Sequence, residues 1–278
     1  MRIINLVENT LGASGCEFAH GLSFYIKTNK HKLLMDLGPS DISLRNAKML
    51  GIDLKEVDTV VLSHGHYDHS GGIIPFANLN KTATIYMQDS ADGEYYADDG
   101  ADLGELRYRF IGIDKRISEL PNLKKIKGDY KIDDELSLFT IKERTNNLPS
   151  TNKRILKKTK DGYLRDDFKH EHYLVLSEGD KNVLISGCAH NGILSILDEY
   201  KALYNSEPDL VVSGFHLMKK VDYNDEEIEE IRHIAKELTS YKTKFVTCHC
   251  TGLYAFEIMK EIMGEQLDYA HSGDEIKF

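Results

Sequence analysis

One stretch of the chain, residues 58–72 (DTVVLSHGHYDHSGG), restricts the fold and the chemistry more than any other. Residues 59–62 form a short, largely β-branched and apolar run, which is typical of a strand buried on both faces. Three histidines and one aspartate follow within six residues: His64, His66, Asp68 and His69. Because side chains of extended backbone repeat every second residue, His64 and His66 are expected on the same side of the chain. Two glycines then let the backbone turn, so that the later donors can face the same point.

These residue types predict a metal site. Imidazole nitrogens and carboxylate oxygens are donors that zinc, iron and manganese all accept. A single histidine after a strand is usually a solvated loop residue. Four such donors in six residues after a buried strand, followed by glycines, instead favour metal binding.

The second half of the chain repeats one pattern: an apolar strand, a glycine or another small residue, and then a histidine. The runs NVLISGCAH, DLVVSGFH and TKFVTCHCTG end in this way at His190, His216 and His249. Sites in open α/β sheets gather at the carboxyl ends of the strands. We therefore expect these histidines to lie close to the cluster at residues 64–69.

Strands and helices alternate along the rest of the chain. Periodicity predicts strands over 2–7, 22–28, 32–36 and 82–88, a hairpin of the runs 172–178 and 182–190, and a last strand at DEIKF. It predicts helices over 42–50, 193–203, 225–239 and 253–263. Two cysteines, at 248 and 250, flank His249. If that run is extended, both thiols face away from the imidazole and belong to the core.

The segment 89–170 is the least regular part of the chain. It is acidic near its start, rich in tyrosine, and basic near residue 155. One interpretation is a solvated insertion. The other is a lid over the metal site, because long loops in compact domains are often functional. The substrate would then touch residues drawn from Tyr95, Tyr96, Arg107, Tyr108 and Arg109.

Composition excludes several classes of function. A net charge of −10 argues against a general binder of nucleic acid or anionic membranes. Four cysteines in a chain of 278 residues do not form a disulfide framework, which fits a reducing compartment. The first residues lack the apolar core of a signal peptide, and no apolar run approaches a membrane span. We expect a cytoplasmic protein with a small-molecule substrate, and a homodimer is left open.

The run HGHYDHSGG resembles the HxHxDH signature of the metallo-β-lactamase superfamily. The run LLMDLG resembles the superfamily's strand that ends in Asp-x-Gly. The runs LISGCAHNGI, VVSGFHL and CHCTG resemble one branch of the superfamily, whose members are labelled metal-dependent hydrolases or dihydropterin ribofuranosylaminobenzene 5'-phosphate synthase-like proteins. The resemblance spans the chain and is weakest over 90–170. It implies an α/β fold, the four-layer αββα sandwich, in one domain over 1–278 with an insertion or lid at about 89–170.

The resemblance also implies a set of metal ligands. Two divalent ions are expected, with zinc as the predicted metal and manganese or iron as alternatives. One ion would take His64, His66 and His190, and the other Asp68, His69 and His249. Asp36, at the end of LLMDLG, is implied to orient a ligating imidazole.

One position departs from the superfamily pattern. The usual bridging aspartate follows a glycine at a strand end, where this chain reads Gly187-Cys188. Cys188 is either a soft ligand or a small buried residue, and the second interpretation is favoured because buried thiols are usually inert.

Other polar residues are predicted to take part in catalysis or substrate binding near the metals. His216 is predicted to act in catalysis from the outer part of the site, and the roles of metal ligand, proton donor to the leaving group and substrate contact are left open. His20 is the alternative proton donor, and Asp68 is predicted to orient the attacking hydroxide. The remaining substrate candidates are His20, Tyr96 and Arg109. Glu171 and His172 are reserve ligands.

The predicted activity follows from the metals. A bound ion lowers the pKa of water from about 15.7 towards 7, so metal-bound hydroxide is expected to attack a phosphorus or carbonyl centre. No G-x-S-x-G motif offers a serine nucleophile instead. We predict a dinuclear metal-dependent hydrolase of a phosphoester. The alternatives are a phosphoribosyl-transferring synthase of pterin biosynthesis and a metal-dependent ligand-binding or sensor protein. A redox di-iron protein is disfavoured, because such relatives usually carry glutamate where this chain has His66.

Overall fold

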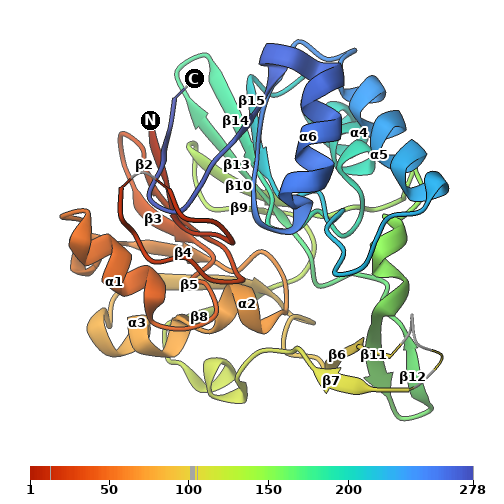
Figure 1. Cartoon of the computed structure of the whole chain (residues 1–278). Coiled ribbons are helices and arrows are strands. Elements are labelled where there is room, and N and C mark those ends of the chain that lie inside the picture. Colours follow the sequence, from red (N-terminus) through yellow and green to blue (C-terminus); the bar gives the residue numbers. More distant parts are fainter. Residues whose placement is uncertain (13, 101–103, 105, 278) are drawn as a thin grey trace.

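Two β-sheets face each other and helices cover their outer sides in the computed structural model (Figure 1). The structure describes residues 1–12, 14–100, 104 and 106–277. The first sheet has the order β18-β1-β2-β3-β4-β5-β8. Its strands are β1 Arg2–Val7, β2 Ser23–Lys27, β3 Lys32–Met35, β4 Thr59–Val61, β5 Thr84–Gln88, β8 Leu123–Ile126 and β18 Glu275–Ile276.

The second sheet has the order β17-β16-β15-β14-β13-β10-β9, and its strands β14 to β17 run parallel. The strands are β9 Tyr130–Lys131, β10 Leu136–Phe139, β13 Tyr173–Glu178, β14 Lys181–Ile185, β15 Leu210–Ser213, β16 Lys244–Thr247 and β17 Leu267–Tyr269. The carboxyl ends of these parallel strands meet at one edge of the sheet, as the repeated strand-histidine pattern predicts.

Helices pack on both outer faces. The first sheet is covered by α1 Ile42–Met49 and α3 Ile73–Leu79, with the short α2 Tyr67–Ser70 at its edge, and the second by α4 Ile193–Tyr204, α5 Asp225–Leu238 and α6 Leu253–Met263 (Figure 1). Five 3-10 helices are described: η1 Leu54–Glu56, η2 Lys115–Glu119, η3 Ser150–Arg154, η4 His249–Thr251 and η5 Gly264–Gln266. A capping box between Asn224 and Glu227 sets the start of α5. No helix in the described ranges is long and apolar enough to cross a membrane.

Alternation along the strands explains the layers. In β2, Phe24 and Ile26 point into the core between the sheets, whereas Tyr25 packs under the outer helices. In β13, Leu174 faces the inner core and Val175 faces the helices of the other side. Strands that are apolar on both faces are buried on both. The prediction of a four-layer αββα sandwich is confirmed.

The segment 89–170 is more ordered than a solvated insertion would be. Its strands β8 to β10 belong to the two main sheets, and four others form a third sheet in the order β12-β11-β6-β7. These are β6 Tyr95–Asp98, β7 Tyr108–Phe110, β11 Ile155–Thr159 and β12 Gly162–Arg165. Residues 101–103 and 105 of the predicted insertion lie outside the described residues.

His31 connects the two main sheets. It lies in the turn between β2 and β3, its Nδ1 is 2.7 Å from Asp58 Oδ1, and its Nε2 is 2.6 Å from Asp133 Oδ2 between β9 and β10. Burial opposes protonation, but the hydrogen bonds to the two carboxylates outweigh it and raise the pKa of His31 above 6.5. The protonated imidazole therefore stabilises the folded chain.

Replacing His31 with glutamine is expected to destabilise the fold by about 1 kcal/mol at about pH 6. Because the folded-state pKa is raised, this contribution is complete below the unfolded pKa of 6.5 and is lost as the pH rises through the folded value. Urea unfolding at about pH 6 and about pH 9 measures the difference. The control His233→Gln removes a side chain that is 64% exposed on α5 and should change the free energy of unfolding by no more than about 0.5 kcal/mol. An equal loss for His31→Gln at both pH values would contradict the assignment.

Candidate metal centre

The loop after β4 brings the HxHxDH donors to the edge of the sandwich. Gly65 lies between His64 and His66. Glycine is needed there because a Cβ would lie 2.2 Å from the carbonyl oxygen of Ala91. Gly71 fits for the same reason, since an added Cβ would lie 2.1 Å from Pro39 O. Only glycine permits these close approaches, which explains the residue pattern physically.

His64, His66 and His190 form one group of donors. One donor atom of each lies within 4.8 Å of those of the other two. The Nε2 atoms of His64 and His190 are 3.3 Å apart. Two nitrogens bound to one tetrahedral zinc at about 2.05 Å would be separated by about 3.3 Å.

The far nitrogens of two of these imidazoles are fixed by the protein. His64 Nδ1 donates to Ser63 Oγ at 2.8 Å, because that hydroxyl gives its own proton to Asp36 Oδ2 at 2.7 Å. His190 Nδ1 donates to Asn152 Oδ1 at 2.9 Å. The two Nε2 lone pairs therefore face each other, an arrangement that a cation between them stabilises.

Asp68, His69 and His249 form a second group. His69 Nε2 lies 3.8 Å and His249 Nε2 3.5 Å from Asp68 Oδ2. His69 Nδ1 donates to Asp36 Oδ2 at 2.6 Å, so the prediction that Asp36 orients an imidazole is confirmed. His249 Nδ1 donates to Asn9 Oδ1 at 2.8 Å. Both Nε2 atoms are thus turned toward the Asp68 carboxylate.

Electrostatics leave neutral imidazoles in the first group and an ionised carboxylate in the second. Burial first, and then neighbouring imidazoles, lower the pKa of His64 well below 6.5, and burial lowers that of His66 to about 3. Both are therefore neutral and offer lone pairs at pH 7. Burial opposes ionisation of Asp68, but histidines such as His69 and His249 outweigh it and hold the pKa of the carboxyl well below 3.8. The second group thus has an ionised carboxylate.

Buried nitrogen atoms without a hydrogen-bond partner indicate whether these residues can hold a metal ion. The Nε2 atoms of His66 and His249 are buried and have no hydrogen-bond partner among the described residues. A buried polar atom without a hydrogen bond or a metal bond lowers the stability of the fold by about 1–3 kcal/mol. Both atoms lie in the predicted donor groups, and imidazole with carboxylate is a donor set that zinc, iron and manganese accept. The residues therefore fit divalent metal ions.

Strain is concentrated at the strand ends that carry the donors. Several non-glycine residues there have left-handed backbone, with φ of 60° at Asp36, 54° at Ala189, and 50° at both His216 and His249. This region is uncommon for residues with a Cβ, and such strain occurs preferentially at functional sites.

A cavity of about 630 Å³ opens over both groups and contains most of the predicted substrate residues. His20 lines it, with Nε2 3.4 Å from Asp68 Oδ2. His216 lines it as well, with its ring centroid 4.1 Å from that of His190. Arg109 also lines the cavity, paired with Asp99 at 2.7 Å. Tyr96 does not belong to the lining and instead packs against aromatic rings of the third sheet.

Comparison with known proteins agrees with this geometry. The family model of the metallo-beta-lactamase superfamily matches residues 17–142. The crystal structure of Tm1679, a metal-dependent hydrolase of the beta-lactamase superfamily, superposes with a TM-score of 0.81 at 28% identity and covers 100% of this chain and 99% of that one. An uncharacterized protein of Methanocaldococcus jannaschii is 30% identical over 274 residues, 96% of each chain. The chain belongs to the metallo-β-lactamase superfamily.

Other members of the superfamily extend the comparison. The 7,8-dihydropterin-6-methyl-4-(beta-D-ribofuranosyl)-aminobenzene-5'-phosphate synthase of M. jannaschii is 27% identical over 297 residues, which cover 100% of this chain and 97% of the synthase. Zn(2+)-bound PqqB of Methylobacterium extorquens shares the fold, with a TM-score of 0.58, 13% identity and 100% of both chains covered. The branch identified from the sequence thus agrees with a relative aligned along the whole chain.

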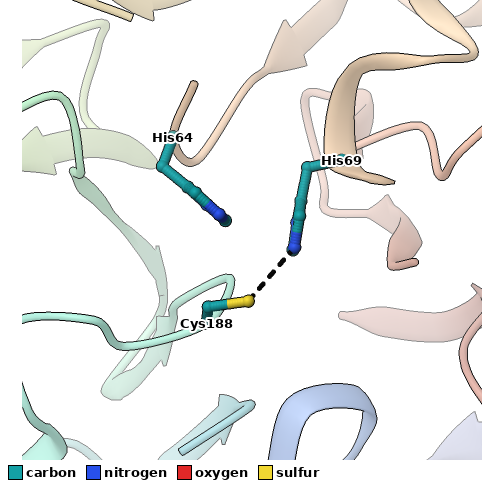
Figure 2. Close-up of side chains that lie close together, drawn as sticks. All are labelled: His64, His69 and Cys188. Carbon is teal, nitrogen blue, oxygen red and sulfur yellow. Dashed lines mark hydrogen bonds between the residues drawn. The ribbon is translucent and has the colours of Figure 1, made fainter. Parts of the chain in front are cut away.

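The departure from the superfamily pattern at Cys188 lies within the donor groups. Figure 2 shows the side chains of His64, His69 and Cys188 pointing toward one another from separate segments. Cys188 Sγ lies 3.2 Å from His69 Nε2. Cys188 is thus buried, as the favoured interpretation expects, and it also contacts a histidine of the second donor group.

Cys250 is buried, as expected, but its thiol does not face away from His249. Strand β16 ends at Thr247, and His249 begins the 3-10 turn η4 with φ 50°, so the alternation of a strand does not continue. The turn carries Cys250 into the cavity lining, with Sγ 3.5 Å from Cys188 O. Cys248 behaves as expected and packs in the core between the sheets.

The sequence reasoning missed two buried residues that support the HxHxDH loop. His170 Nδ1 accepts a hydrogen bond from Gly65 N at 2.9 Å, and its Nε2 donates to Asp166 Oδ2 at 2.9 Å. The histidine just ahead of the run HYLVLSE was the available signal. The reserve candidate Glu171 accepts from the backbone N–H of His190 at 2.7 Å, and His172 donates to Leu62 O at 2.8 Å. Both therefore hold neighbouring backbone in place.

Replacing Asn152 with alanine is expected to weaken metal binding about 10–100-fold, because His190 loses the acceptor that fixes its ring. Competition with a chromophoric chelator measures the affinity. The control Asn146→Ala changes an asparagine of the same segment that bonds Asp198 instead. Unchanged affinity in the Asn152 variant would remove His190 from the ligand set.

Proposed function

We propose that the chain is a metal-dependent hydrolase that cleaves a phosphoester. The observation that carries the proposal is the convergence of donors from strand ends far apart in the sequence, which leaves unpaired imidazole nitrogens beneath one cavity. One divalent ion would be held by His64, His66 and His190 and a second by Asp68, His69 and His249. Zinc is the expected metal, with manganese and iron as alternatives.

A divalent ion in such a site makes a water nucleophilic near pH 7 and stabilises negative charge on oxygen. The protein supplies the rest. The ionised Asp68 carboxylate faces the cavity and can orient the attacking water. The imidazole of His20, whose Nε2 lies 3.4 Å from Asp68 Oδ2, lines the cavity and can donate a hydrogen bond to the substrate. His216 lines the same cavity, and its buried Nδ1 has no partner among the described residues, which supports a role for it as proton donor to the leaving group.

Basic side chains at the cavity support an anionic substrate. The lining includes Arg109, Lys153, Arg154, Lys219 and Lys220, although the chain carries a net charge of −10. Arg109 and Arg154 both pair with Asp99, and Lys219 pairs with Glu227. Lys153 and Lys220 make no ion pair within 4 Å in the described part of the chain. These two ammonium groups are available to bind a phosphate.

Elemental analysis followed by a substrate panel tests the proposal. We expect two equivalents of a divalent metal per chain and cleavage of bis-p-nitrophenyl phosphate or a cyclic nucleotide in preference to a lactone. A metal-loaded chain that cleaves none of these phosphoesters would contradict the proposed reaction.

Replacing Lys153 or Lys220 with alanine is expected to raise KM for the phosphodiester about tenfold, or about 1.4 kcal/mol, with little change in kcat. A neutral ester substrate should be unaffected, since it gains nothing from the ammonium groups. The control Lys158→Ala removes a lysine on β11 that does not line the cavity. An equal loss on both substrates would show that the lysines act through structure rather than through charge.

A second candidate function is a phosphoribosyl-transferring synthase of pterin biosynthesis. It is favoured by the 27% identity to the M. jannaschii synthase along the whole chain, and the basic cavity also suits a phosphoribosyl donor. Release of pyrophosphate from phosphoribosyl pyrophosphate, in the presence of an aminobenzoate acceptor, would support it over hydrolysis. Tight ligand binding without turnover would instead indicate a sensor.

A further inference from the structure

The ring of Phe168 lies flat against the imidazole of His190. The two ring centroids are 4.6 Å apart, and the ring planes differ by only 3°. Phe168 is 1% exposed, so water does not separate the two rings. Aromatic rings that interact favourably in proteins have centroids about 4.5–7 Å apart, and such pairs add stability beyond the area they bury. The stack therefore restricts the plane in which the His190 ring can lie.

The backbone of Phe168 is strained. Its φ is 51°, a left-handed conformation that is an outlier for a bulky side chain. Hydrogen bonds enforce this conformation: Phe168 N donates to Asp166 Oδ1 at 2.9 Å, and Phe168 O accepts from Glu171 N at 3.1 Å and from Asn191 Nδ2 at 3.2 Å. Such strain persists only where the surrounding structure enforces it, and it clusters at functional sites. The turn between β12 and β13 is thus built to hold the ring against His190.

The third sheet supports the other side of the Phe168 ring. Phe168 belongs to the apolar core of that sheet, together with Tyr95, Ala97, Ile111 and Ile155. The last three of these residues also line the cavity over the donor groups. The sheet that forms part of the cavity wall therefore also backs a predicted metal ligand.

The plane of the His190 ring matters for metal binding. The Nε2 lone pair lies in the ring plane, so the plane decides whether that lone pair points to an ion shared with His64, whose Nε2 is 3.3 Å away. The hydrogen bond from Nδ1 to Asn152 Oδ1 fixes one atom of the ring and still lets the ring tilt about that bond. A flat contact on the face of the imidazole removes this freedom.

We propose that Phe168 is a positioning residue of the metal centre: its ring fixes the plane of His190 and thereby sets the affinity of the first donor group, His64, His66 and His190, for its ion. Residues that orient a metal ligand typically change metal affinity about 10–100-fold when they are replaced. The inference rests on the metal site of the proposed function but does not depend on its substrate.

The variant Phe168→Leu keeps an apolar side chain and removes the flat ring. Competition of the zinc-loaded full chain with a chromophoric chelator should show one of the two equivalents of zinc bound about tenfold more weakly, with the other within about twofold of the wild type. The control Phe76→Leu makes the same change at a side chain that is 0% exposed in the core under α1 and α3. It should lower Tm, as a loss of core packing does, and leave both zinc affinities within about twofold.

A second measurement uses only the wild-type chain, in case the leucine variant does not fold. Nuclear Overhauser effects between the ring protons of Phe168 and His190 should be present in the metal-free and in the zinc-loaded chain, because the stack sets the ring plane before the ion binds. Their absence from either state would overturn the proposal. Unchanged zinc affinities in Phe168→Leu, or an equal loss of both equivalents, would overturn it as well. One weakened equivalent in a chain that cleaves no phosphoester would overturn the proposed function and leave this inference standing.

Discussion

Replacing Asp68 with alanine is expected to lower kcat on the phosphodiester by about 1000-fold, with the far-ultraviolet circular dichroism of the wild type retained. The carboxylate is held ionised among histidines, and its Oδ2 lies 3.4–3.8 Å from the nearest nitrogens of His20, His69 and His249. No other described carboxylate lines the cavity except Glu227, which is paired with Lys219. Loss of Asp68 therefore removes the group that orients the attacking water.

A matched control separates this effect from the loss of any buried carboxylate. Glu135→Gln changes an acid that is 7% exposed and hydrogen-bonded to Thr28, and that does not line the cavity. It should retain kcat within about twofold of the wild type, because its role is structural. An Asp68→Ala chain with kcat within about tenfold of the wild type would remove Asp68 from the catalytic centre.

The sequence was sufficient to predict the sheets and the meeting of the histidines, because the local apolar pattern indicates which strands are buried and where they end. A strand buried on both faces reads as an apolar run, and parallel strands end at one edge, so histidines after successive strands were expected to meet. The structure brings His64, His190, His216 and His249 to one cavity or directly beneath it. The two sheets and their outer helices follow from the same alternation of apolar residues.

The sequence was insufficient where one backbone dihedral angle sets the direction of a side chain, or where a hydrogen-bond partner lies far away in the chain. Period-two alternation past Thr247 predicts that Cys250 faces away from His249, whereas His249 turns the chain at φ 50°. Asn152 and His170 act on the site through hydrogen bonds to His190 and Gly65, residues 38 and 105 positions away. No local pattern encodes a contact at that separation. Such partners become visible only when the folded chain brings the segments together.

Metal removal is expected to lower Tm by roughly 10 °C. Without a cation, the buried Nε2 atoms of His66 and His249 lack partners, and those of His64 and His190 face each other at 3.3 Å. An ion that binds only the folded chain at 1000 times its Kd stabilises it by about 4 kcal/mol, and each kcal/mol moves Tm by about 2–4 °C in a chain of this size.

Calorimetry of the chelator-treated chain, before and after zinc is restored, measures this shift. In the His64→Gln variant the shift should shrink by at least about half, because one ligand group is broken. His233→Gln, an exposed histidine on α5, should keep the full shift and controls for the loss of an imidazole elsewhere. Equal Tm values with and without metal would mean that the imidazoles do not share a cation. In that case, the orphaned nitrogens beneath the cavity would have to be satisfied by water, and the proposed hydrolysis would lose its source of nucleophile.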